Sequence, residues 1–307
     1  MIVLAGATAS GKTDLAVSLA AGIGGEIVSA DSRQVYRRLD AGTAKPSDAQ
    51  RKRVVHWLID CADPGEIFDV ARWAAEAASA VAGIRKRGKI PVVCGGTGLY
   101  LRALLDGLSP LPARNEAARA RLSAEAERLG REALHARLAA ADPAAAASIP
   151  AGNLQRVVRA LEVLELTGKP ISEHWREGRG AGMPADLVLR LDLPLDEGRA
   201  RIETRARAMW PGLLKEVGAL VPAHFLGDEP GFTSLGYREA LACARGEITS
   251  DEGLAAMIRA TLAYAKRQRT WFRNQLPAKS LNATLTAEDL LSRALQAWEE
   301  AREKSSV

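Results

Sequence analysis

The segment GATASGKT, from Gly6 to Thr13, matches the phosphate-loop pattern G-x-x-x-x-G-K-[ST]. An apolar run precedes it and a helical pattern follows, which is the context that the pattern requires. In such a loop, backbone N–H groups and the positive end of the helix bind an anion. Lys12 would neutralise terminal phosphate oxygens, and the Thr13 hydroxyl could ligate Mg²⁺. The motif predicts a diphosphate or triphosphate site, and a glycine turn with a solvated lysine is the weaker alternative.

A carboxylate that could act as a base is Asp31, which follows the apolar segment 26–30. We expect that segment to be a strand of a parallel sheet, whose carboxyl end lines the ligand crevice. There Asp31 could accept a proton from an attacking hydroxyl or amine, or hold a metal through water. A turn aspartate that only caps the next segment explains the position equally well.

A third candidate is the turn Gly95-Gly96-Thr97-Gly98, which follows an expected strand at 89–94. Three glycines in four residues indicate that the backbone closely approaches a neighbouring group, although a tight strand-to-helix turn is the alternative. No acid ends this strand, whereas ATP-hydrolysing phosphate-loop proteins usually place an aspartate there. This absence argues against a plain ATPase.

These candidates need a scaffold of alternating strands and helices, and the first 110 residues supply that pattern. Strands are expected at 1–5, 26–30 and 89–94, and helices at 12–21, 71–86 and 99–105. The order predicts an α/β fold, a phosphate-loop NTPase-like parallel sheet with helices on both faces.

The pattern changes after the punctuated segment 107–112. From residue 113 to about residue 175 only helical periodicity is present, and a second flexible joint lies at 178–184. An alternating strand follows at 187–193, then helices at 197–210, which Pro211-Gly212 should end, and at 250–276. We predict a core formed by residues 1–112 and 185–307, with an all-helical insertion at 113–184.

Basic charge gathers near the C-terminus, although 42 Lys and Arg against 37 Asp and Glu leave the chain at only +5. No acid occurs from 254 to 287, where basic residues alternate with Tyr264, Trp271 and Phe272. Such a stretch suits a phosphate backbone and unpaired bases, and a helix with a solvated basic face is an equal alternative. Arginine pairs at 156/159 and 201/205 could clamp phosphates, but surface charge is the better explanation for both.

Composition excludes several protein classes. Apolar residues at 47% and charged residues at 26% are ordinary globular values. Three widely spaced cysteines exclude a disulfide framework, and no apolar run is long enough to span a membrane. We expect a cytoplasmic, monomeric protein without a membrane partner.

Taken together, these segments resemble one family, the bacterial tRNA dimethylallyltransferases, also called tRNA isopentenyltransferases. The resemblance is carried by GATASGKT at 6–13, DSRQVYRRLDAGTAKPS at 31–47, GGTGLYLRALLDGLSPLP at 95–112, NLQRVVRALEVLELTGKPIS at 153–172, TSLGYRE at 233–239 and KRQRTWFRNQ at 266–275. The phosphate loop is generic, whereas the other segments are specific. One departure is Val55-His56-Trp57, where the family often has paired histidines, and we assign His56 no role.

The resemblance implies transfer of the dimethylallyl group from dimethylallyl diphosphate to N6 of the adenosine 3′ of the anticodon, with Mg²⁺ as cofactor. Asp31 would be the general base, and Lys12, Thr13, Thr97 and Arg205 would also serve catalysis. The residues implied to hold the diphosphate are Gly6, Ala7, Thr8, Ala9, Ser10, Gly11, Lys12, Thr13 and Arg205.

The tRNA anticodon stem-loop is the implied partner. The positions that match the family's tRNA contacts are Asp31, Ser32, Arg33, Gln34, Thr97, Arg119, Gln155, Arg156, Val157, Val158, Arg159, Thr233, Ser234, Leu235, Gly236, Tyr237, Arg238, Lys266, Arg267, Gln268, Arg269, Thr270, Trp271, Phe272 and Arg273.

Three other functions remain open from the sequence. An adenylate isopentenyltransferase would use a free nucleotide and would not need the helical insertion or the basic C-terminal helix. A small-molecule kinase would want a metal-binding acid at a strand end. A non-catalytic tRNA-binding protein would show no turnover.

Overall fold

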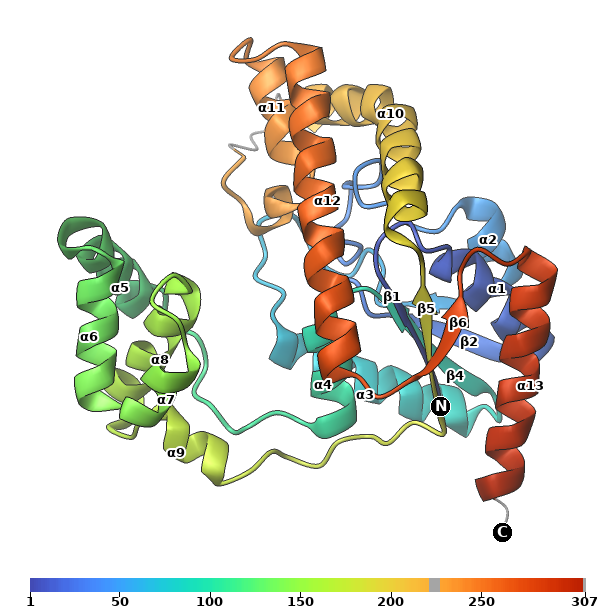
Figure 1. Ribbon diagram of the computed structural model, residues 1–307, viewed down its shortest axis with the longest axis horizontal. Coiled ribbons are helices and arrows are strands. Elements are labelled where there is room, and N and C mark those ends of the chain that lie inside the picture. Colours follow the sequence, from blue (N-terminus) through green and yellow to red (C-terminus); the bar gives the residue numbers. More distant parts are fainter. Residues whose placement is uncertain (221–226, 306–307) are drawn as a thin grey trace. The chain divides into compact units, whose positions relative to one another are not determined.

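The computed structural model describes residues 1–220 and 227–305, which form two compact units (Figure 1). One unit comprises Met1–Leu105 and Met183–Val307, and the other comprises Asp106–Gly182. The boundaries of the helical insertion predicted from the sequence were 112/113 and 184/185.

The first unit is built on one sheet of six described strands, all parallel, in the order β3-β2-β4-β1-β5-β6. The strands are β1 (Ile2–Gly6), β2 (Gly25–Ser29), β3 (His56–Trp57), β4 (Ile90–Gly95), β5 (Leu187–Asp192) and β6 (Lys279–Asn282). Because every strand runs the same way, all carboxyl ends share one edge, where ligands bind in such sheets. The predicted α/β class is confirmed.

Helices cover both faces of this sheet (Figure 1). Alternate β1 residues point to opposite faces, so Ile2 and Leu4 pack toward α1 (Lys12–Gly22) and α13 (Ala287–Ser305). The next residues along β1, Val3 and Ala5, join the larger core on the other face. Helices that contribute to that core include α3 (Val70–Lys86), α4 (Gly98–Asp106), α10 (Leu195–Leu220) and α12 (Ser250–Gln275). The other helices of this unit are α2 (Asp48–Arg53), α11 (Tyr237–Ala244) and the 3₁₀ turn η2 (Pro230–Thr233).

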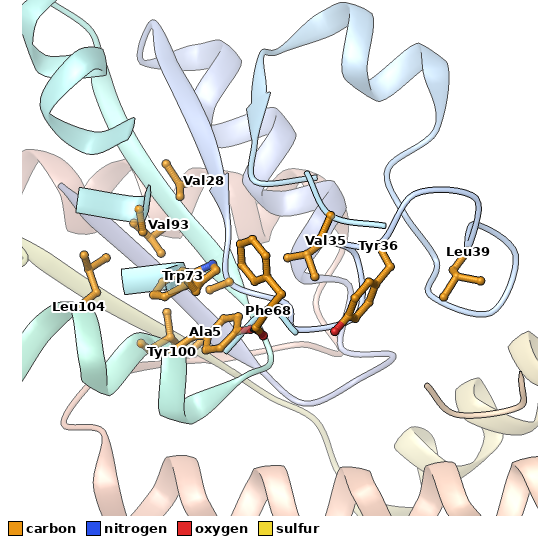
Figure 2. Packing of buried hydrophobic residues seen from close by; sticks show 14 of the residues in the cluster. Ala5, Val28, Val35, Tyr36, Leu39, Phe68, Trp73, Val93, Tyr100 and Leu104 are labelled. Carbon is orange, nitrogen blue, oxygen red and sulfur yellow. Dashed lines mark hydrogen bonds between the residues drawn. The ribbon is translucent and has the colours of Figure 1, made fainter. Parts of the chain in front are cut away.

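An aromatic cluster fixes α3 and α4 on that second face (Figure 2). The rings of Trp73 and Tyr100 stack with centroids 4.5 Å apart. Trp73 also donates a hydrogen bond from Nε1 to the Ser29 carbonyl, at 3.0 Å. This bond ties the core to the carboxyl end of β2, next to Asp31.

The structure corrects the expected end of one helix and adds two strands. Helix α10 continues through Pro211 to Leu220. Interrupting the hydrogen-bond ladder there costs about 3 kcal/mol, and burial of Trp210, Leu213 and Val217 on both sides of the proline offsets it. Strand β3 has only two residues, and β6 has one buried side chain, so neither carries an alternating pattern.

The second unit consists of helices and no strand across residues 106–182, all of which the structure describes. Its helices are α5 (Glu116–Leu129), α6 (Arg131–Ala141), α7 (Pro143–Ser148), α8 (Leu154–Thr167) and α9 (Ile171–Arg176). They enclose their own apolar core, and within it Glu162 is fully buried. The Glu162 carboxylate pairs with Arg119 and Arg159, at 3.3 and 3.0 Å. This charge cluster organises the start of α5 against α8.

No described helix combines the length and apolarity that crossing a bilayer requires. Cys61, Cys94 and Cys243 are free thiols.

A buried carboxylate, Glu26, lies near the amino end of β2. It accepts hydrogen bonds from Trp57 Nε1 at 2.8 Å and Arg87 Nη2 at 2.7 Å, and Lys89 Nζ lies 3.0 Å away. Burial alone would raise the pKa of Glu26, but these donors outweigh it and lower the pKa to about 2.

We therefore expect Glu26→Gln to lower the free energy of unfolding by an amount on the order of 3 kcal/mol at pH 7. Since the folded-state pKa lies below the unfolded value of 4.5, the stabilisation is complete above pH 4.5 and is lost as the pH falls toward 2. Urea unfolding between pH 7 and pH 2.5 measures this, with the exposed Glu299→Gln as the control. A stability difference between wild type and variant that does not shrink with falling pH would contradict the assignment.

Candidate active site

A cavity of about 310 Å³ opens at the carboxyl edge of the sheet, within the first unit. It brings together residues from segments that are distant in sequence. The predicted site residues that line it are Thr8, Lys12, Thr13, Asp31, Arg33, Gln34, Arg205, Thr233, Ser234, Leu235, Arg267 and Gln268. The sheet edge, α10, the 233–235 segment and α12 therefore form one site.

The phosphate loop connects β1 to α1 at this edge. Gly11 precedes α1 with φ +84°, a left-handed conformation that glycine adopts without strain, and Ala9 also has a positive φ of +62°. A Cβ atom at Gly6 would lie 2.7 Å from Ser10 Oγ, so this position has no room for a side chain. Ala9 and Gly11 line a smaller hollow beside the main cavity, together with Lys12, Thr13 and Arg205. The free N–H groups at the start of α1 therefore face an anion-sized space.

Two half-buried cations, Lys12 and Arg205, lie in the cavity wall. Lys12 Nζ donates to the Ala7 carbonyl at 3.3 Å, and burial lowers the pKa of this lysine. Burial also lowers the pKa of Arg205, against the opposing effect of Asp31 and Asp14. Within the described part of the chain neither cation forms an ion pair at 4 Å or less. Their unpaired charge predicts an anionic ligand.

Asp31 both shapes a turn and faces the cavity. Its Oδ1 accepts a hydrogen bond from the Arg33 backbone N–H at 2.9 Å, as a turn aspartate would. The same residue lines the cavity beside Lys12 and Arg205, so both interpretations of its position apply. Its other oxygen, Oδ2, has no hydrogen-bond partner in the described residues and is available to a ligand.

The residues that follow Asp31 are fixed by a network of hydrogen bonds. The Thr97 hydroxyl accepts a bond from Ser32 N at 3.0 Å, and Arg33 Nη1 donates to Thr233 Oγ1 at 2.6 Å. Gln34 Nε2 donates to the Ala44 carbonyl at 3.1 Å and holds the 43–44 segment against the cavity. Thr97 and Ser32 do not line the cavity. Their hydrogen bond holds the segment after Asp31 in place.

Some predicted tRNA-binding residues have buried side chains. Tyr237 and Phe272 belong to the main core, and Val157 and Val158 belong to the core of the helical unit. Gly236 precedes α11, and Trp271 packs against α4 through Gly98. Packing explains the four buried side chains, and any contact with RNA at those positions would come from the backbone.

Other predicted contacts lie outside the cavity. Arg119 and Arg159 are engaged with Glu162, while Gln155 and Arg156 are exposed at the start of α8. The predicted residues of α11 and α12 that are not cavity-lining and not buried are Arg238, Lys266, Arg269, Thr270, Trp271 and Arg273. Their contact with tRNA stays a prediction, and their side chains are accessible enough to make it.

Several cavity-lining residues were not predicted. Ala16, Ile27, Pro46 and Ile59 give one part of the wall an apolar surface. Tyr264 lines the wall from α12, one turn before Gln268, and burial raises its pKa. Apolar residues of this kind look like ordinary core in a sequence, so only the fold identifies them; Tyr264 was noted only as an aromatic between basic residues.

Two further lining side chains, His56 and Cys94, favour their uncharged forms. His56 Nδ1 lies 2.8 Å from the Val54 carbonyl, and burial lowers the pKa of the ring, so it is neutral. Burial raises the pKa of Cys94 to about 12, which leaves a protonated thiol beneath Lys12.

The donor set suits a magnesium ion that arrives with its anion. No group of three or more His, Cys, Asp or Glu side chains in the described residues could form a metal cage. Thr13 and Asp31 are oxygen donors on the cavity wall. Mg²⁺ typically keeps several waters and takes one or two protein oxygens together with substrate phosphates, which fits this pair.

Comparison with known proteins identifies the family of this chain. The profile of the IPP transferase family matches residues 34–275. A tRNA dimethylallyltransferase from Anaeromyxobacter sp. (strain Fw109-5) is 47% identical over 293 residues, covering 95% of this chain and 98% of that protein. One from Roseiflexus sp. (strain RS-1) is 47% identical over 298 residues, covering 96% of each.

A solved structure agrees along the whole chain. The full-length tRNA isopentenylpyrophosphate transferase from Bacillus halodurans superposes with a TM-score of 0.72 at 33% identity, covering 100% of this chain and 99% of that one. Since the profile matches most of the chain and the relatives and the solved structure match nearly all of it, the chain belongs to the IPP transferase family.

Proposed function

We propose that this protein transfers the dimethylallyl group of dimethylallyl diphosphate to N6 of the adenosine on the 3′ side of the anticodon in tRNA, releasing diphosphate. The observation that carries the proposal is a single cavity lined by the half-buried cations Lys12 and Arg205, by Asp31 and by apolar side chains. Relatives at 47% identity bear the name tRNA dimethylallyltransferase.

The two kinds of cavity wall match the two parts of the donor. The phosphate loop, Lys12 and Arg205 would bind the diphosphate, and the apolar wall around Ala16, Ile27 and Ile59 would take the five-carbon chain. As the allylic C–O bond breaks, the bonding pair leaves with the diphosphate, whose growing charge the two cations stabilise. When bound, Mg²⁺ would add Lewis-acid stabilisation of that leaving group, with the Thr13 hydroxyl as its protein donor.

Asp31 is placed to serve the acceptor. The adenine N6 amine attacks C1 of the prenyl group, a C–N bond forms, and one N–H proton must leave. The Asp31 carboxylate would take that proton, because it lines the cavity and one of its oxygens is uncommitted. The adenine must leave its stack to enter the cavity, and an unpaired anticodon loop makes this extrusion less costly.

The RNA contact would follow α12, which is both a cavity wall and a basic surface. Arg267 and Gln268 line the cavity. Lys266, just before them, and Arg273, farther along the same helix, are exposed. Burial and the neighbouring Arg273 lower the pKa of Arg269, which marks uncompensated positive charge there. This surface favours tRNA over a free nucleotide, and Gly95-Gly96 at the end of β4 offers no kinase-type acid. We propose a monomeric, cytoplasmic enzyme.

We expect Asp31→Asn to lower the turnover number by about a hundredfold or more while leaving tRNA affinity unchanged, because the amide cannot accept the N6 proton. The measurement is single-turnover formation of prenylated adenosine, detected by mass spectrometry after digestion of the tRNA. The exposed Asp48→Asn is the matched control. A wild-type rate in Asp31→Asn would remove Asp31 as the base.

Replacing both Arg269 and Arg273 by alanine should weaken tRNA binding and flatten its salt dependence. Losing two phosphate contacts lowers the magnitude of the slope of log K against log salt concentration by roughly 1.5, since fewer counterions are released. Filter binding from 50 to 300 mM KCl tests this. Arg85→Ala with Lys86→Ala, which removes the same charge from exposed positions at the end of α3, is the control. An unchanged slope would make the basic face of α12 a solvated surface only.

A further inference from the structure

One buried amide joins α12 to both glycine-rich segments of the site. Gln268 Oε1 accepts a hydrogen bond from the Thr8 backbone N–H at 2.9 Å, in the phosphate loop. Gln268 Nε2 donates to the Gly96 carbonyl at 2.8 Å, in the turn after β4. The residue is only 7% exposed. The side chain therefore links two loops that lie more than 170 residues away from it in sequence.

The turn after β4 is shaped to admit this helix. A Cβ atom at Gly96 would lie 2.5 Å from Gln268 Nε2, and one at Gly98 would lie 2.3 Å from the Trp271 ring. Gln268 and Trp271 are three residues apart and therefore on the same face of α12. Gly96 and Gly98 therefore make room for α12 itself, whereas Gly95 makes room for Ala30.

The anchored loop holds a conformation that would not be stable by itself. It includes Ala9 at φ +62° and Gly11 at φ +84°, and non-glycine residues keep positive φ angles only when their surroundings enforce them. The Gln268 bond fixes the chain at Thr8, one residue before Ala9. An anion that binds to the N–H groups at the start of α1 then does not have to order the loop first.

The amide is thus committed to the protein backbone. One donor and one acceptor of Gln268 are engaged, while its neighbour Arg267 is exposed and lines the cavity. Without the amide, the Thr8 N–H and the Gly96 carbonyl would lose their shared partner in a buried setting.

We propose that Gln268 is a positioning residue that holds the phosphate loop in its diphosphate-binding conformation. The identity of the anion rests on the proposed function, whereas the positioning does not require prenyl transfer. This role differs from the direct tRNA contact that the sequence resemblance implied for Gln268.

The test is Gln268→Met, which keeps the length of the side chain and removes both hydrogen bonds. Calorimetric titration with inorganic pyrophosphate and Mg²⁺ should show a Kd raised about tenfold or more. The KM for dimethylallyl diphosphate should rise in parallel, with the Kd for tRNA within twofold of wild type. Gln275→Met, the same change at the exposed end of α12, is the matched control and should alter none of these. If Gln268→Met does not fold, Gln268→Asn, which keeps the amide but is one methylene shorter, should give the same change.

Three results would overturn the proposal. An unchanged pyrophosphate Kd in a folded variant would show that the loop needs no anchor. A lower Kd would show that Gln268 competes with the anion for the Thr8 N–H. A raised Kd for tRNA with unchanged pyrophosphate binding would favour a direct contact between Gln268 and tRNA. Loss of pyrophosphate affinity in Gln268→Met without prenyl transfer in the wild type would contradict the proposed function alone.

Discussion

The unpaired, half-buried positive charge of Lys12 and Arg205 is the constraint on which the rest of the site depends. Burial disfavours the charged form of both side chains, and no carboxylate of the described residues pairs with either one. A bound diphosphate would remove this cost, because it supplies several negative oxygens in the space that both cations line. Residues of the phosphate loop, the start of α1 and Asp31 together line the adjoining main cavity.

The parallel sheet and α12 place these groups together. Parallel strands bring the ends of β1, β2 and β4 to one edge, so that the phosphate loop, Asp31 and the Gly95–Gly98 turn become neighbours. Helix α12 then closes this edge from outside through Gln268 and Trp271. The same helix carries the basic face that we assign to tRNA, so the proposed donor and acceptor sites would share one wall.

The sequence predicted the class of fold and the chemistry, but it left the three-dimensional contacts open. Strands β1, β2, β4 and β5 are apolar or alternating runs and could be found, whereas the two-residue β3 and the mostly exposed β6 have no such signal. The break expected at Pro211 was wrong because packing on both sides of the proline offsets its local cost. Nothing in the spacing of residues shows that Gln268 meets Thr8, or that the glycines near Thr97 make room for α12 rather than for a ligand.

The most direct test of this account is the product that the wild-type protein makes from dimethylallyl diphosphate. The purified protein is incubated with Mg²⁺, the donor, and either unmodified tRNA or free AMP, and the digested products are examined by mass spectrometry. The account predicts prenylated adenosine from tRNA and none from AMP. Product from AMP alone would contradict the role given to α12, and turnover of ATP without prenylation of either acceptor would contradict the assignment of the phosphate loop.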